Sequence, residues 1–158
     1  MKKLVMYITA LFTALAVLPA AAQDISVYAD SSFQPALGEL VPLFSERTGF
    51  GVQLTLAPSS ILSVQIREGA VPDLFFPAGE SFMKQVMEKG LVDVALKRNV
   101  LSLPAPEPAD PEAPADPQYT SAAVLNEAPH RLQAMAFLEF LVSDEARAVF
   151  ARQGFGLP

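Results

Sequence analysis

The feature that most constrains this chain is an acidic, proline-rich run from Pro104 to Gln118. It reads PAPEPADPEAPADPQ and holds six prolines and four carboxylates in fifteen residues. Proline lacks the backbone donor that helix interiors and central strands need, so this run cannot belong to a packed core. We expect a linker, extended at ~3.1 Å per residue where it adopts polyproline II. The core must therefore come from the flanking blocks, residues 23–103 and 119–158, folded as one discontinuous lobe.

The first 22 residues have the pattern of a secretory signal peptide. Lys2 and Lys3 form a positive start, residues 4–18 are apolar, and small residues precede the expected cleavage at Gln23. This apolar stretch is shorter than the roughly 20 residues that a membrane-spanning helix needs. We therefore expect export to the periplasm, with no membrane insertion after the signal is cleaved.

Charge and cysteine content narrow the classes of partner. Without Lys2 and Lys3, the exported chain carries nine basic and seventeen acidic side chains, a net charge near −8. Nucleic acids and anionic membranes bind basic patches, so neither is an expected partner. The chain has no cysteine, which excludes disulfides, thiol catalysis and thiolate metal sites. Roughly 120 residues outside the linker suit one modest domain.

The hydrophobic pattern predicts an α/β fold. Short apolar strands alternate with helices that start at serine or glutamate and end at glycine, which indicates a parallel sheet with right-handed crossovers. We expect a single three-layer lobe with a mainly parallel sheet. The expected strands are 24–29, 52–56, 74–76 and 120–125, and the expected helices are 31–48, 61–68, 80–89, 129–142 and one capped by Ser143.

Few residues suggest catalysis or a resident metal. His130 is the single histidine, and we interpret it as a solvated residue at a helix start. Asp73 is a lone carboxylate suited to capping or turn hydrogen bonds, and Asp30 is interpreted as a turn residue. No metal-ligand spacing, nucleophile elbow or phosphate loop is found. We predict a protein that is not an enzyme and has no cofactor.

Two serine pairs follow successive predicted strands. Ser31 and Ser32 follow the first strand, and Ser59 and Ser60 follow the second. Two interpretations stay open. The serines can be simple helix caps. Alternatively, because the carboxyl ends of parallel strands share one edge, the two turns form a neutral, donor-rich cradle for a small oxyanion, without Lys or Arg.

Several segments, in order, resemble the periplasmic molybdate-binding proteins of ABC importers. Residues 25–32 (ISVYADSS) resemble the opening strand and serine turn of that family, and residues 56–69 (LAPSSILSVQIREG) resemble its second serine turn and helix. Residues 70–78 and the tail 136–146 (AFLEFLVSDEA) are also similar. The resemblance covers about residues 25–100 and 119–156.

The resemblance implies a fold and a function. The family has two α/β lobes (the type II periplasmic-binding-protein architecture). The first and last parts of the chain form lobe one, and the segment between them forms lobe two. Here the linker replaces lobe two. The implied function is the substrate-binding component of an ABC importer, with molybdate or tungstate as ligand and an ABC permease as partner. The alternative is an exported single-lobe remnant or interaction module that no longer binds a ligand. A homodimer could complete the cleft.

The resemblance also assigns the site. The serine contacts to the oxyanion fall on Ser32 and Ser59, with Ser31 and Ser60 as neighbours, and no protein atom coordinates the metal directly. The family's other contacts, two backbone amides and a tyrosine hydroxyl, belong to the absent lobe, and Tyr119 is not that tyrosine. Losing three hydrogen bonds to a charged group costs ~4.5–9 kcal/mol. A site of ~1 μM affinity would then become millimolar or weaker.

Overall fold

The computed structural model describes residues 24–103 and 118–158. The expected signal peptide (residues 1–22) and nearly all of the expected linker lie outside the described residues. One linker boundary is wrong, because Gln118 is the first residue of a strand that runs to Leu125.

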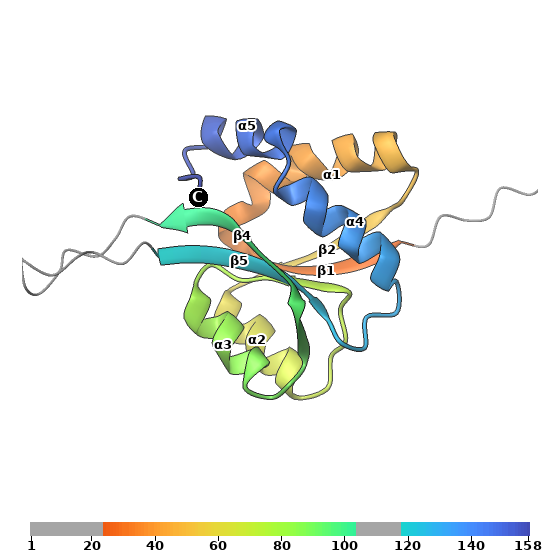
Figure 1. Ribbon diagram of the computed structural model, residues 1–158, viewed down its shortest axis with the longest axis vertical. Coiled ribbons are helices and arrows are strands. Elements are labelled where there is room, and N and C mark those ends of the chain that lie inside the picture. Colours follow the sequence, from red (N-terminus) through yellow and green to blue (C-terminus); the bar gives the residue numbers. More distant parts are fainter. Residues whose placement is uncertain (1–23, 104–117) are drawn as a thin grey trace, which may run out of the picture.

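The described residues form three layers (Figure 1). Helices α1, α4 and α5 cover one face of a five-stranded sheet, and α2 and α3 cover the other. This confirms the predicted three-layer α/β lobe. The elements in chain order are β1 Ile25–Asp30, the 3₁₀ turn η1 Ser31–Phe33, α1 Gln34–Thr48, β2 Val52–Ala57, α2 Ser59–Arg67, β3 Leu74–Phe76, α3 Glu80–Met87, β4 Val92–Leu103, β5 Gln118–Leu125, α4 Arg131–Leu141 and α5 Asp144–Arg152.

The sheet is mixed, so the prediction of a mainly parallel sheet was wrong. Its strand order is β2-β1-β3-β5-β4. Strand β1 lies parallel to β2 and β3, whereas β5 lies antiparallel to both β3 and β4. The reason is that β4 and β5 pair directly with each other, from Leu103 opposite Gln118 to Val92 opposite Leu125. Such antiparallel neighbours need no helical crossover between them.

Strand β4 was missed by the sequence prediction. Its pairing with β5 is interrupted by register shifts between Val92 and Lys97 and between Asn99 and Leu101. Each irregularity resets the alternation of inward and outward side chains, as a β-bulge does. The regular period-2 pattern that identifies a strand is therefore absent from this segment.

The core lies on both faces of the sheet. On the α1, α4 and α5 face, Phe33 stacks on Phe76 with ring centroids 4.3 Å apart, and Phe44 meets the edge of Phe137 at 4.9 Å. On the opposite face, a smaller cluster surrounds Phe75 beneath α2 and α3. Strand β3, which the sequence predicted at residues 74–76, is buried on both faces and lies in the centre of the sheet.

The helix ends follow the sequence signals. Helix α1 runs through Pro42 and ends at Gly49, whose φ of 76° is a left-handed conformation that suits glycine. The Ser143 hydroxyl accepts a hydrogen bond from the Ala146 amide at 3.3 Å and so caps α5, as predicted. Among the described residues, no helix is long and apolar enough to cross a membrane.

Candidate ligand-binding edge of the sheet

The two serine turns lie side by side. Strands β1 and β2 are parallel neighbours, and their last residues, Asp30 and Ala57, are register partners. The turn η1 therefore begins beside the start of α2, at the carboxyl ends of both strands. Ligands of open α/β sheets bind at this edge. The sequence predicted this placement of the serine turns, and the fold agrees with it.

Ser59 makes the hydrogen bonds that connect the segments at this edge. Its side chain is buried, with 3% of its surface exposed. Its hydroxyl donates to the Asp30 carboxylate (Oγ to Oδ2, 2.5 Å), and its backbone N–H donates to the same oxygen at 2.8 Å. The same hydroxyl accepts from the Ala78 amide at 2.8 Å. Ser59 thus joins the carboxyl ends of β1, β2 and β3.

The other three serines have exposed side chains. Ser31 and Ser32 lie in η1, and Ser60 is the second residue of α2. The Ser32 backbone N–H donates to Asp30 Oδ1 at 3.0 Å, so Asp30 caps η1. The structure therefore brings Ser32 and Ser59 together through one shared carboxylate.

Asp30 makes the edge acidic. Burial raises the pKa of its carboxyl, but hydrogen bonds from Ser59 and Ser32 lower it by more, so the pKa lies below its ordinary value. The carboxylate is therefore ionised at neutral pH. The interpretation of Asp30 as a turn residue was right for the bond to Ser32 but incomplete. The predicted cradle is not neutral, because an aspartate accepts the serine donors.

A second polar cluster lies along the same edge, at the start of α3. The Glu80 carboxylate accepts hydrogen bonds from Lys97 of β4 and from the Ser121 hydroxyl of β5. Both charged side chains are largely buried, with 22% of Lys97 and 28% of Glu80 exposed. Sequence reasoning missed this pair because it missed β4, the strand that carries Lys97.

Asp73 and His130 have structural roles. Asp73 is 1% exposed, and its carboxylate accepts from the backbone amides of Ser26 (2.8 Å) and His130 (2.5 Å). Asp73 thus has a hydrogen-bonding role, as predicted, but its partners lie 47 and 57 residues away in the sequence and not in a turn of its own. The interpretation of His130 as solvated was wrong: its ring is about three-quarters buried and lies 3.2 Å from Asp73.

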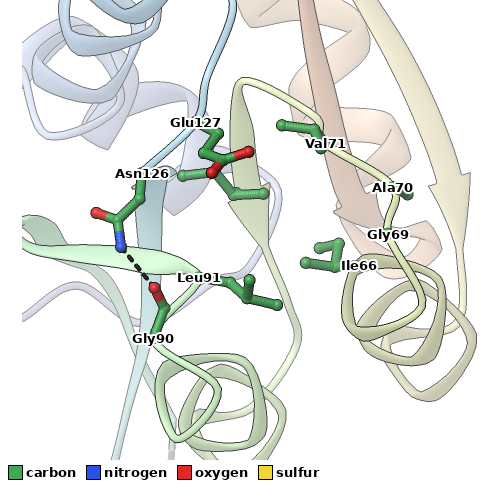
Figure 2. Close-up of a pocket in the computed structure, with 9 residues that line it drawn as sticks. Ile66, Gly69, Ala70, Val71, Gly90, Leu91, Asn126 and Glu127 are labelled. Atoms are coloured by element: carbon green, nitrogen blue, oxygen red, sulfur yellow. Dashed lines mark hydrogen bonds between the residues drawn. The ribbon is translucent and has the colours of Figure 1, made fainter.

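No trio of His, Cys, Asp or Glu in the described ranges, 24–103 and 118–158, is arranged to hold a metal ion. A hollow of about 250 Å³ lies at the opposite edge of the sheet, near the starts of β3 and β4 (Figure 2). Its lining is mostly apolar, and Asn126 donates to the Gly90 carbonyl at 2.6 Å beside it. The serine turns do not contribute to this hollow.

An α/β lobe with helix-opening turns gathered at the carboxyl ends of parallel strands has the architecture of a ligand-binding domain. The chain matches the bacterial extracellular solute-binding protein family over residues 25–116 and 108–156, and it belongs to that family. Members of this family are binding proteins and not enzymes.

Two curated relatives are named molybdate-binding protein ModA. The one from Escherichia coli K12 is 32% identical over 77 residues, which make up 49% of this chain and 30% of that protein. The one from Rhodobacter capsulatus is 36% identical over 73 residues, 46% of this chain and 29% of that protein. The matches thus cover under a third of the length of these relatives.

Solved structures share the fold. The periplasmic molybdate-binding protein of Azotobacter vinelandii superposes with a TM-score of 0.72 at 13% identity, covering 85% of this chain and 99% of that chain. The sulfate-binding protein SubI of Mycobacterium tuberculosis H37Rv superposes with a TM-score of 0.67, also at 13% identity. This match covers 84% of this chain and 86% of that chain. At such identities the likeness concerns the fold alone.

Proposed function

We propose that this chain is the substrate-binding component of an ABC importer, exported to the periplasm as a single lobe. The observation that carries the single-lobe architecture is the pairing of Leu103 with Gln118, the residues that flank the proline-rich segment. Chain ends on paired strands are close enough for a short connection to join them. A second lobe could therefore be absent without disturbing this sheet. The family match in two segments, 25–116 and 108–156, which overlap within the proline-rich run, agrees with that arrangement.

The proposed ligand is a small oxyanion of the molybdate or tungstate type, held by Ser32 and Ser59, with Ser31 and Ser60 beside them. Support comes from the two relatives named for molybdate. Further support comes from the donors that already converge on one anionic group, the Asp30 carboxylate. Hydroxyl and amide donors of this kind bind an anion without a cationic side chain.

A second candidate is an exported single-lobe module that no longer binds a ligand. One observation favours it: the Ser59 hydroxyl and amide both donate to Asp30, so neither is free for a solute. The exported chain would then serve as an interaction module or persist as a remnant.

Calorimetric titration of the exported chain with molybdate separates the two candidates, with chloride as a reference anion. The oxyanion proposal expects saturable binding with a Kd below about 1 mM, equivalent to −4.1 kcal/mol or better. Ser32→Ala should weaken this binding, and Ser32→Ala combined with Ser59→Ala should abolish it.

Ser45→Ala is the matched control, because Ser45 lies near the far end of α1, remote from the serine turns. This variant should bind like the wild type. Circular dichroism must first show that every variant is folded. If the folded wild type gives no binding heat with molybdate up to several millimolar, the result favours the module that binds no ligand.

A further inference from the structure

The donors of the two serine turns are already bound to an anion that belongs to the chain itself. Asp30 Oδ1 accepts from the Ser32 amide at 3.0 Å, and Oδ2 accepts from the Ser59 amide at 2.8 Å and the Ser59 hydroxyl at 2.5 Å. These lengths are typical of hydrogen bonds to a carboxylate. The carboxylate oxygens therefore lie where the oxygens of a bound oxyanion would accept the same bonds.

Ser59 has no further proton to offer. A hydroxyl has one proton and two lone pairs, and a backbone amide has one proton. Both protons of Ser59 point to Asp30, and the hydroxyl oxygen also accepts from the Ala78 amide. Because the Ser59 side chain is nearly fully buried, it cannot turn toward solvent without breaking these bonds. A solute can reach these donors only by displacing the carboxylate.

We propose that Asp30 determines the anion affinity of this edge by competing, as a tethered carboxylate, for the donors of Ser32 and Ser59. This inference rests on the proposed oxyanion site. An incoming oxyanion must break the Asp30 bonds and then lie beside the displaced negative charge, which repels it at a distance of a few ångströms. Removing the carboxylate removes both penalties.

The test is calorimetric titration of the exported chain with sodium molybdate, comparing the wild type with Asp30→Ala and Asp30→Asn. Asp30→Ala frees all three donors, and we expect its Kd to be at least tenfold lower than that of the wild type. Asp30→Asn removes the charge but keeps an oxygen that can accept from Ser59, so we expect a smaller, several-fold gain. Asparagine also caps helices as well as aspartate does, so this variant decides the question if Asp30→Ala fails to fold.

Asp24→Ala is the matched control. It removes the same charge just before the start of β1, at the opposite edge of the sheet, where the carboxylate accepts from the Gln53 side chain. Its Kd should stay within twofold of the wild type. A gain equal to that of Asp30→Ala would overturn the proposal, because net charge alone would then explain the effect.

The outcomes separate this inference from the proposed function. Tighter binding by Asp30→Ala than by the wild type supports the inference. If Asp30→Ala binds molybdate and the wild type does not, the donors can bind an oxyanion but the native chain is not an oxyanion carrier. Equal or weaker binding by the folded Asp30 variants, with a wild type that binds, overturns the inference and leaves the proposed function standing. Absence of binding by the wild type and by every folded variant overturns both the inference and the proposed oxyanion function.

Discussion

The Asp73 carboxylate accepts a hydrogen bond from the backbone amide of His130, 57 residues further along the chain, at 2.5 Å. Asp73 precedes β3, and His130 precedes α4. The bond therefore connects the two sequence blocks that the proline-rich segment separates. It complements the pairing of β5 with β3 and β4, through which the second block completes the sheet.

Asp73→Ala should destabilise the fold by about 2 kcal/mol or more, because it leaves the partly buried amides of Ser26 and His130 without their acceptor, at ~1–3 kcal/mol each. Urea unfolding followed by circular dichroism measures the loss. Glu46→Ala, an exposed position in α1, is the control and should stay within about 0.5 kcal/mol of the wild type. A similar small loss for Asp73→Ala would contradict the role assigned to this carboxylate.

Ser59→Ala should cost about 1–3 kcal/mol, because the Ala78 amide and the Asp30 carboxylate each lose a partner. Ser60→Ala, at the exposed neighbouring position, should change the free energy of unfolding by no more than about 0.5 kcal/mol. Chemical denaturation of the two variants provides the comparison. Equal stabilities would mean that the Ser59 bridge adds nothing to the fold.

The stabilising effect of Asp30 should depend on pH. Its pKa is lowered in the folded state, so the ionised carboxylate stabilises the fold above the unfolded pKa of ~3.9, and this contribution is lost as the pH falls through the folded value. Asp30→Asn cannot titrate. The difference in unfolding free energy between wild type and Asp30→Asn should therefore be largest above about pH 5 and shrink below about pH 4. A difference that is constant from pH 7 to pH 3 would rule out this linkage.

Phe76→Ala should be among the most damaging core substitutions. The ring is fully buried, stacks on Phe33 at 4.3 Å and meets the edge of Phe150 at 6.3 Å. Removing a buried aromatic ring costs ~3–5 kcal/mol. Thermal unfolding should show a large fall in Tm, whereas Val71→Ala, at an exposed position, should leave Tm nearly unchanged. A small effect of Phe76→Ala would mean that the core repacks around the missing ring.

Replacing residues 104–117 by a four-residue Gly-Ser loop should leave the lobe folded. The flanking residues Leu103 and Gln118 are paired, so a short loop can connect them. Shortening the connection should raise the free energy of unfolding by about 1 kcal/mol, because the loop-closure entropy cost falls with length. Urea titration tests this expectation. Loss of folding would show that the proline-rich segment contributes to the stability of the lobe.

Much of this fold could be predicted from local sequence signals. The apolar run at residues 74–76 indicated a strand, Gly49 indicated a helix end, and Ser143 indicated a cap, because each effect acts within one turn or one strand. The position of the serine turns at one sheet edge also followed from the sequence, since strands joined by right-handed crossovers run parallel.

The sequence by itself determined the α/β class and the two serine turns, because propensity, periodicity and capping depend on neighbouring residues. Only the tertiary structure decided the antiparallel half of the sheet, since the irregular pairing of Val92–Leu103 hides its strand pattern. The tertiary structure also decided which group accepts the hydrogen bonds of the serine turns. The contact between Asp30 and Ser59 joins residues 29 positions apart, and only the pairing of β1 with β2 places that carboxylate on those donors.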